Sequence, residues 1–372
     1  MMKILFNNLA PQWQKIKSLS QERINNLFSS SQFINGPDVE IFEKNFSRWN
    51  GNKYAIGVSS GTDAIRVSLQ SLNLDGNVQI YTLANTFIAT VFAAEMAFNS
   101  NCEIHLIDHD EFLLMDINKL EEVLIKNHSK GPNIIIPVHL YGQCCDMENI
   151  LELATKFEAT IVEDCSQAHG SLCENEKKVG TYGTISAFSC YPGKNLGAAG
   201  DAGVIVTNNL ELAKACKKIR SQGQRKKYIH EVKGGTYRLD TLQAIILDEK
   251  LKFLDEWNER RIKAAECYEK NINNNNIIIP PRANFCKKHV YHIFALLVKK
   301  RNEFITHMSK NNIPTMMHYP IPIEESRAYK YLNQNNKKTR NSAKNIVSLP
   351  IHPFMSQQEL RYICRIINKF NP

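Results

Sequence analysis

The 372-residue sequence has no apolar run that approaches the ~20 residues needed to cross a lipid bilayer. Its first fifteen residues, MMKILFNNLAPQWQK, contain only a short apolar stretch and no small-residue cleavage site, so they do not resemble a secretory signal peptide. Hydrophobic residues make up 43% of the chain and charged residues 22%, which is typical of soluble globular proteins. We therefore expect a cytoplasmic protein with no membrane partner.

The ten cysteines show no C-x-x-C spacing, which argues against the common cysteine-rich metal sites. Cys144 and Cys145 are adjacent, and this is a poor spacing for two ligands of one metal ion. We expect reduced thiols that fill small gaps in the core, and no metal site.

Positive charge exceeds negative charge by nine, which favours an acidic partner such as nucleic acid, a membrane surface or a small phosphorylated ligand. The densest basic segment, KACKKIRSQGQRKK at 214–227, holds seven Lys or Arg residues. It has neither interleaved aromatic residues nor a recognition-helix motif, so we expect no nucleic-acid partner. A solvated helix face is the favoured interpretation of this segment, and diphosphate binding is the alternative.

Apolar runs typical of strands alternate with segments of helical periodicity through about residue 210. The strand-like runs are YAIGV, QIYTL, EIHLID, NIIIPVHL and ATIVED. Asp146 is a candidate N-cap of the helix between the last two runs. This alternation predicts an α/β fold in which helices cover both faces of a mostly parallel sheet. We assign it to a large domain over residues 1–250.

The pattern changes near Leu251. A long charged helix, KLKFLDEWNERRIKAAECYEK, is followed by a predicted strand, HVYHIFALLV, and by a last helix that opens with a capping box at Ser356–Glu359. We predict a smaller α+β domain over residues 251–372.

Sites in such sheets gather at the carboxyl ends of the strands. Lys194 lies in one such loop, CYPGKNLGAAGDAG. A phosphate-binding P-loop is excluded because Asn195 follows the lysine where Ser or Thr is needed. Two interpretations remain open from this segment: an exposed loop lysine, or a desolvated lysine that forms a Schiff base with an aldehyde.

Asp164 ends the strand-like run ATIVED, so its carboxylate either projects into a cleft or caps the following turn. A pyridoxal ring needs a carboxylate beside its nitrogen, because a protonated pyridine is the better electron sink. Successive strand residues point to opposite faces, so only one of Glu163 and Asp164 should reach a site.

Gly61 and Thr62 begin a predicted helix, whose N-terminus favours a phosphate group, although SGT is also a common capping sequence. Ser189, five residues before Lys194, could give a phosphate another hydroxyl. Phe87 is predicted to open the next helix and could stack on a ring, with core packing as the ordinary alternative.

Taken together, these segments resemble the DegT/DnrJ/EryC1/StrS family of sugar aminotransferases over nearly the whole chain. The motifs that carry the resemblance are FINGPDVEIFEKNF, GVSSGTDAI, NTFIAT, PVHLYGQ, EDCSQAHGS, FSCYPGKNLGAAGDAG, YRLDTLQA, HYPIP and SLPIHPFM. The resemblance implies the aspartate-aminotransferase (type I) fold. It also implies pyridoxal 5′-phosphate as cofactor, with pyridoxamine 5′-phosphate as its intermediate form.

The resemblance also implies roles for single residues. Lys194 matches the Schiff-base lysine and Asp164 the partner of the pyridine nitrogen, so both are expected to be catalytic. The remaining cofactor contacts are Gln167 at the ring hydroxyl, Phe87 on the ring face, and Gly61, Thr62 and Ser189 around the phosphate.

Members of this family work as homodimers in which the neighbouring subunit completes each active site. That contribution comes from the stretch holding Tyr228, His230 and Arg238. Two residues before Arg238, Thr236 stands where the family has an asparagine that reaches the cofactor phosphate; a threonine has a shorter reach. Tyr191 and His318, together with Tyr228 and His230, are expected to contact the substrate.

The form PGKNLGA-x-GD-x-G looks most like the branch that aminates C3 of dTDP-linked 3-keto-6-deoxyhexoses. The resemblance thus implies a nucleotide-diphosphate keto sugar and L-glutamate as substrates. The alternative is a 4-aminotransferase of a 4-keto sugar, whose branch tends to carry TTGEGG after the lysine. Related sugar dehydratases replace the lysine with histidine, so Lys194 argues against that activity. Retention of Lys194, Asp164 and Gln167 argues against a regulator that has lost catalysis.

Overall fold

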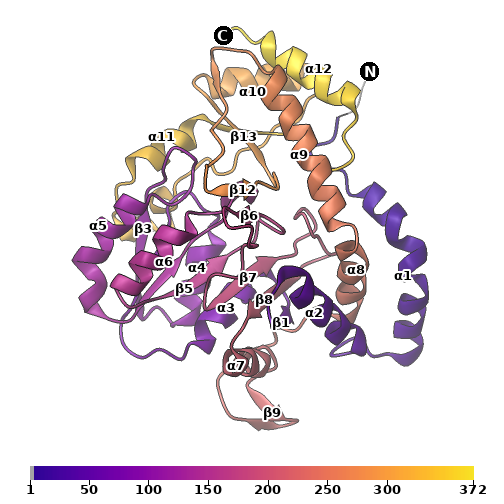
Figure 1. Cartoon of the computed structure of the whole chain (residues 1–372), viewed down its shortest axis with the longest axis vertical. Coiled ribbons are helices and arrows are strands. Elements are labelled where there is room, and N and C mark those ends of the chain that lie inside the picture. The colour runs from indigo at the N-terminus through magenta and orange to yellow at the C-terminus, as the bar shows by residue number, and fades with distance from the viewer. Residues whose placement is uncertain (1–3) are drawn as a thin grey trace.

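The computed structural model describes residues 4–372, and its centre is a seven-stranded sheet (Figure 1). The strand order is β1-β8-β7-β5-β4-β2-β3. β8 (Gly203–Thr207) pairs antiparallel with both of its neighbours, so it alone runs against the other six. The expected mostly parallel sheet is therefore confirmed. The other strands are β1 (Tyr54–Val58), β2 (Val78–Leu83), β3 (Cys102–Ile107), β4 (Asn133–Ile136), β5 (Ala159–Asp164) and β7 (Ile185–Ser189).

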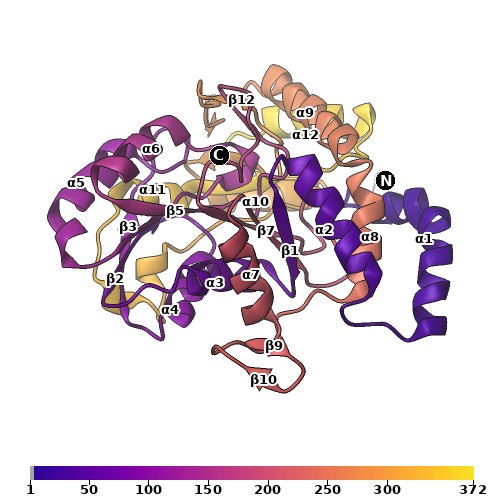
Figure 2. The ribbon, with the colours of Figure 1, turned by 60° about the horizontal axis from the view of Figure 1, so that its bottom comes forward.

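Helices cover both faces of this sheet (Figure 2). Alternate side chains of a strand point to opposite faces, and β4 shows this directly. Ile134 and Ile136 pack in one core cluster, whereas Ile135 packs in another. The first cluster contains α3 (Gly61–Ser71), α4 (Ala89–Ala97) and α7 (Leu210–Arg220), and the second contains α2 (Pro37–Asn50), α5 (Ile117–Asn127), α6 (Met147–Lys156) and α8 (Thr241–Leu251).

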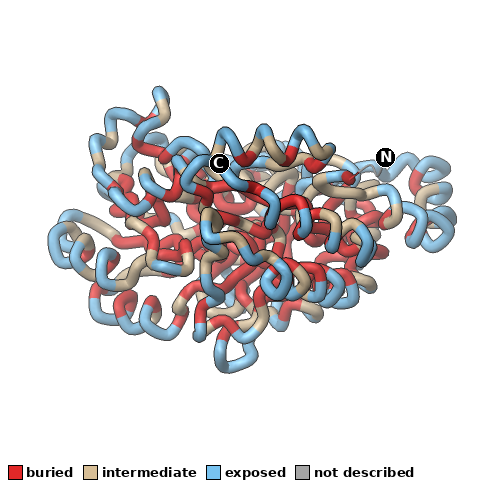
Figure 3. The backbone as a smooth tube through the Cα atoms, turned by 90° about the horizontal axis from the view of Figure 1, so that it is seen from above, coloured by how far each residue is buried: buried red, intermediate tan, exposed pale blue. Residues whose placement is uncertain are grey.

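The C-terminal part of the chain builds a third core cluster around a three-stranded sheet. Viewed from above, buried segments fill the interior and exposed segments form the rim (Figure 3). This separate core supports the predicted boundary between two domains near residue 250. The boundary itself stays a prediction. Its main elements are α9 (Leu254–Asn271), β11 (Ile277–Ile278), β13 (Phe294–Val298), α10 (Arg301–Lys310), β14 (Ile346–Leu349) and α12 (Gln357–Asn368).

The long helix expected from about Leu251 is interrupted, and this part of the prediction is wrong. α8 ends at Leu251, and α9 begins at Leu254 after a break at Lys252 and Phe253. α8 packs against α1 (Ala10–Ser30) and α2, whereas α9 packs against α12. The break separates two helices that pack in different cores.

The strand expected over 289–298 begins only at Phe294. The residues before it pair instead with a turn of the large sheet: the Val290 N–H donates to Gly142 O at 2.9 Å, and the Ile293 N–H donates to Tyr141 O at 3.3 Å. The backbone groups of these residues therefore form hydrogen bonds with the 140–142 turn and not with a neighbouring strand. Likewise α4 begins at Ala89, so Phe87 lies in the preceding loop and does not open the helix.

β7 and β8 were not among the predicted strands, and the run NIIIPVHL is a strand only as far as Ile136, whereas the helix starts predicted at Asp146 and Ser356 are correct. The Asp146 carboxylate caps α6 by accepting from the Asn149 N–H at 3.3 Å, and the capping box at Ser356–Glu359 is present. All ten cysteines are free, and eight of them are buried, as expected for thiols that fill gaps. No helix within residues 4–372 combines the length and apolar character that a membrane span requires.

The first half of the basic segment is a helix face in contact with solvent. In α7 the side chains of Ala213, Cys216 and Ile219 are buried. The lysines between them are exposed or partly exposed and pair with carboxylates: Lys214 with Glu211 at 2.8 Å and Lys218 with Glu231 at 2.6 Å. The favoured interpretation of a solvated face therefore describes α7 well.

Candidate active site

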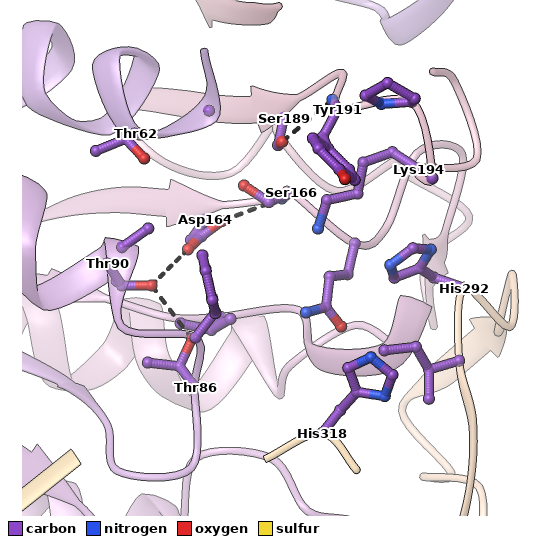
Figure 4. Close-up of a pocket in the computed structure, with 18 of the residues that line it drawn as sticks. Thr62, Thr86, Thr90, Asp164, Ser166, Ser189, Tyr191, Lys194, His292 and His318 are labelled. Atoms are coloured by element: carbon purple, nitrogen blue, oxygen red, sulfur yellow. Dashed lines mark hydrogen bonds between the residues drawn. The ribbon is translucent and has the colours of Figure 1, made fainter. Parts of the chain in front are cut away.

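A cavity of about 620 Å³ lies at the carboxyl ends of the central strands, beside the N-terminus of α3 (Figure 4). Its position matches the expectation for an open α/β sheet. Nine of the twelve predicted site residues line it: Gly61, Thr62, Phe87, Asp164, Gln167, Ser189, Tyr191, Lys194 and His318.

The other three predicted residues lie elsewhere in this chain. Tyr228 and His230 belong to a hairpin of β9 (Gln224–Lys226) and β10 (Ile229–His230) that projects from the body of the molecule (Figure 2). Tyr228 is 78% exposed. Thr236 accepts a hydrogen bond from Gln222 Nε2 at 3.1 Å at the base of this segment. Their expected roles in the cavity of a neighbouring subunit stay a prediction.

Lys194 follows β7 in a compact turn. Its backbone N–H donates to Tyr191 O at 2.8 Å. A Cβ on Gly197 would lie 2.2 Å from Pro192 O, so the turn closes this tightly only with glycine. Burial lowers the pKa of Lys194 to about 8, although the charges of Asp164 and Cys190 act in the opposite direction. A sizeable fraction of the amine is therefore neutral near pH 8, the form that attacks an aldehyde.

Asp164 is the last residue of β5, and its carboxylate is 4% exposed in the floor of the cavity. Its Oδ2 accepts from Thr90 Oγ1 at 2.8 Å, and its Oδ1 accepts from the Ser166 N–H at 3.1 Å. Figure 4 shows these bonds holding the carboxylate opposite Lys194. The two donors fix its orientation and leave acceptor capacity toward the cavity.

Glu163 points to the opposite face of β5, as the alternation of strand residues requires. It is fully buried and accepts from His139 Nε2 at 3.0 Å. Four further donors are the backbone N–H groups of Gly180, Tyr182 and Gly183 and the Ser186 hydroxyl. Burial raises the pKa of Glu163, but His139 and the backbone donors outweigh it and hold the pKa below its ordinary value. Glu163 therefore stabilises the loop that follows and does not reach the cavity.

Gln167 has its side-chain amide fixed in one orientation. Its Oε1 accepts from the Tyr141 N–H at 2.8 Å, so its Nε2 is the group that faces the cavity. There it donates to Tyr319 Oη at 3.1 Å. The Tyr319 ring lies 5.5 Å from the ring of Phe87. The Gln167 Nε2 donor and the rings of Tyr319 and Phe87 therefore border the space between Asp164 and the mouth of the cavity.

The N-terminus of α3 forms the opposite end of the cavity. Ser60 caps the helix by accepting from the Asp63 N–H at 3.0 Å. Within residues 4–372 no protein group accepts from the N–H groups of Gly61 and Thr62. A Cβ on Gly61 would lie 2.4 Å from the Cβ of Ser189, so glycine is needed to bring Ser189 against the helix start. Free N–H groups and hydroxyls at a helix N-terminus form an anion site.

Several residues of this cavity were missed in the sequence. Thr90 lies among the apolar residues of α4. A buried hydroxyl in such a place is a signal that it has a polar partner, here a carboxylate. Asn7 donates from Nδ2 to Gly193 O at 3.4 Å, a contact between the N-terminal segment and the Lys194 loop. His292 and Tyr319 come from segments that were interpreted only as a strand and as a family motif.

Comparison with known proteins places this geometry in one family. The model of the DegT/DnrJ/EryC1/StrS aminotransferase family matches residues 14–368. The dTDP-3-amino-3,6-dideoxy-alpha-D-galactopyranose transaminase of Aneurinibacillus thermoaerophilus is 38% identical over 352 residues, which is 94% of each chain.

Two solved structures are similar over almost the whole chain. DesV of S. venezuelae, in complex with a ketimine intermediate, has a TM-score of 0.93 at 30% identity and covers 99% of this chain and 98% of its own. The protein ntda of Bacillus subtilis, with bound cofactor PMP, has a TM-score of 0.88 at 28% identity, with 99% and 85% covered. The chain belongs to the DegT/DnrJ/EryC1/StrS aminotransferase family and is a pyridoxal-phosphate-dependent nucleotide-sugar aminotransferase with the type I fold.

Proposed function

We propose that this enzyme transfers an amino group from L-glutamate to C3 of a dTDP-linked 3-keto-6-deoxyhexose. The observation that carries the proposal is one cavity in which a lysine with a lowered pKa faces a buried carboxylate, beside a helix N-terminus with free N–H groups. The loop sequence after Lys194 and the printed name of the A. thermoaerophilus relative support C3 and dTDP.

The residues present fit pyridoxal phosphate. The Gly61 and Thr62 N–H groups and the Ser189 hydroxyl would hold its phosphate. Asp164, oriented by Thr90, would hold the protonated ring nitrogen, and Gln167 Nε2 would donate to the ring hydroxyl.

The ring face would rest on Phe87, which is 52% exposed and free to take a stacking partner. Gln167 Nε2 now donates to Tyr319, so this donor would have to change its acceptor when the cofactor binds.

When bound, the cofactor supplies an aldehyde and an electron sink. Lys194 would supply the amine that holds it and, once glutamate has taken the place of that amine, would act as the base that removes a proton from the donor carbon and delivers it to the cofactor. Asp164 keeps a negative charge against the ring nitrogen throughout. The same residues would work in reverse when the keto sugar enters.

Tyr191 and His318 are placed to meet the sugar. Tyr191 is 58% exposed at the mouth of the cavity. His318 lies on the far wall from α3, where its Nδ1 is 2.8 Å from Ser348 Oγ (Figure 4). Burial and the charge of Lys194 lower the pKa of His318 to about 4, so it would act as a neutral hydrogen-bonding group.

The enzyme would work as a homodimer in the cytoplasm. In this proposal Tyr228, His230 and Thr236 would enter the cavity of the partner from the projecting hairpin, together with the basic residues before it. This accounts for a hairpin that carries a 78% exposed tyrosine and makes few contacts with its own chain.

The test is steady-state amination of dTDP-linked 3-keto and 4-keto 6-deoxyhexoses with glutamate as donor. We expect the 3-keto sugar to react with the higher kcat/KM. A clear preference for the 4-keto sugar would overturn the assignment to C3 and favour the 4-aminotransferase alternative.

A further inference from the structure

His292 is a cavity residue that the proposed reaction leaves without a role. It lies on the same wall as Lys194 (Figure 4), and it reaches the cavity because residues 289–293 leave strand geometry to pair with Tyr141 and Gly142. Its Nδ1 is 3.2 Å from Oδ1 of Asn195, the residue that follows the lysine.

A chain of buried amides fixes which nitrogen of His292 carries the hydrogen. Asn195 Nδ2 donates to Asn258 Oδ1 at 2.8 Å and to Val290 O at 3.0 Å. Asn258 Nδ2 in turn donates to His169 O at 2.8 Å, which fixes the Asn258 amide as well. Both hydrogens of the Asn195 amide are therefore used, and its Oδ1 can only accept from His292.

The Nε2 of His292 therefore carries a lone pair. Burial lowers the pKa of His292 well below its ordinary value. The positive charges of Lys194 and Arg261, and those of His318 and His169 at a pH low enough to protonate them, lower it further. These groups come from four different segments packed around the ring. Asn195, the hydrogen-bond partner on the other side, is uncharged. The imidazole is neutral in this setting, with Nδ1–H as donor and Nε2 as acceptor.

Two complementary groups lie in this wall. Within residues 4–372 the His292 ring hydrogen-bonds through Nδ1 alone, and Figure 4 shows no hydrogen bond from Lys194 Nζ to the residues around it. The Lys194 Nζ is a donor in both protonation states, and the His292 Nε2 is an acceptor. We propose that His292 is a positioning residue, which accepts a hydrogen bond from Lys194 Nζ whenever that amine is released from the cofactor.

Such a bond would direct the released amine. A neutral amine that donates one N–H to His292 must aim its lone pair elsewhere, and the rest of the cavity is where the donor carbon would lie. The inference rests on the proposed role of Lys194 as the lysine that binds the cofactor.

Three variants separate the acceptor from the rest of the ring. His292→Asn keeps a donor near Asn195 but has no group at the Nε2 position. His292→Leu removes both nitrogens at similar size, so the two together distinguish loss of the acceptor from loss of the Asn195 bond. His292→Gln places an amide oxygen near the Nε2 position and is the matched control.

The experiment measures the pKa of Lys194 directly in the pyridoxamine form of each holoenzyme. Acetic anhydride labels free amines across a pH series, and mass spectrometry quantifies acetylation of the Lys194 peptide against the exposed Lys53. An acceptor stabilises the ammonium, so we expect His292→Asn and His292→Leu to lower the pKa of Lys194 by about one unit and His292→Gln to keep it near wild type. The isotope effect with C2-deuterated glutamate should rise in the first two variants while the KM for glutamate stays unchanged.

Unchanged Lys194 labelling and isotope effects in both His292→Asn and His292→Leu would overturn the inference. So would a His292→Gln enzyme as impaired as His292→Leu. Borohydride trapping of the cofactor distinguishes failure of the His292 proposal from failure of the Lys194 proposal. If the cofactor is trapped on Lys194 but the labelling is unchanged, only the role of His292 is refuted. If no cofactor is trapped on Lys194, the proposed role of Lys194 is refuted as well.

Discussion

Thr90 Oγ1 donates a hydrogen bond of 2.8 Å to Asp164 Oδ2, and this joins α4 to the carboxylate in the floor of the cavity. Thr86 Oγ1 lies 3.2 Å from the Thr90 hydroxyl and extends the chain of polar groups. The arrangement places a hydroxyl among the buried apolar side chains of α4 because the buried carboxylate needs an oriented donor.

Thr90→Val should therefore weaken cofactor binding without unfolding the protein. Losing a hydrogen bond to a charged group costs ~1.5–3 kcal/mol, which corresponds to roughly a tenfold to hundredfold higher Kd for pyridoxal phosphate. Titration of the apoenzyme by visible absorbance measures this. Thr90→Ser keeps the hydroxyl and should bind nearly as wild type; equal affinity of the valine and serine variants would contradict the assigned role of the hydroxyl.

Substitutions of the neighbours Glu163 and Asp164 should have different effects: the first should lower stability and the second should lower activity. Glu163→Gln turns a carboxylate that accepts from five donors into an amide that carries hydrogens of its own. We expect a loss of unfolding free energy of roughly 3 kcal/mol and a lower Tm. Asp164→Asn should keep its Tm within a few degrees but lose most amination. The comparison needs thermal unfolding and kcat/KM for both proteins, and a Glu163→Gln variant of wild-type Tm would refute the structural role.

The lowered pKa of Glu163 also predicts how the stability of the protein changes in acid. The folded pKa of Glu163 is held below its ordinary value of 4.5, so its stabilising effect is complete above pH 4.5 and is lost as pH falls through the folded pKa. The stability gap between wild type and Glu163→Gln should therefore be constant near neutral pH and shrink in acid. Urea unfolding at several pH values would show this, and a gap that widens in acid would be the wrong sign.

Lys194→Met should stabilise the apoenzyme in a pH-dependent way. The folded pKa of Lys194 is about 8 against an ordinary 10.5, so below pH 8 folding must bury an ammonium at full cost. Between 8 and 10.5 the folded protein releases the proton while the unfolded chain keeps it, and the stability of wild type rises. The advantage of the methionine variant, on the order of 2 kcal/mol, should be greatest below pH 8 and vanish near 10.5. Lys194→Arg keeps the charge and should show no such gain in Tm.

Subunit mixing tests the shared active site. Lys194→Ala and a hairpin variant, Tyr228→Ala with His230→Ala, should each be inactive. Co-refolded in equal amounts, they should regain activity at about a quarter of the sites, because half of the dimers are mixed and each mixed dimer has one site with both parts intact. If the mixture stays inactive while mixed dimers are detected by native mass spectrometry, each chain completes its own site.

Much of the fold could be predicted because local chemistry determines it. The apolar runs predicted five of the seven strands of the large sheet, and Asp146 and Ser356 marked helix starts through short-range hydrogen bonds. The antiparallel direction of β8 and the break before α9 were not evident, since both depend on partners distant in the chain. Likewise the backbone of residues 289–293 follows a pairing with Tyr141 and Gly142 that no local pattern encodes.

The site divides in the same way. Lys194, Asp164 and the start of α3 lie at strand ends, where topology alone predicts convergence. His292 meets Asn195 across 97 positions, and Asn195 meets Asn258 across 63, so nothing in the surrounding sequence identifies them as a connected network. Their residue types are ordinary, and only the fold brings them together behind the lysine.

The most direct test of the account is chemical mapping of the covalent lysine. A second buried lysine offers a real competitor: Lys250 donates to Gly197 O at 2.7 Å, and burial lowers its pKa to about 8 as well. Purified holoenzyme is reduced with borohydride and digested, and the peptides are mapped by mass spectrometry. We predict that the reduced cofactor lies on the peptide that contains Lys194, and that Lys194→Ala carries none. Cofactor attached to Lys250, or retained covalently after borohydride reduction of Lys194→Ala, would contradict it.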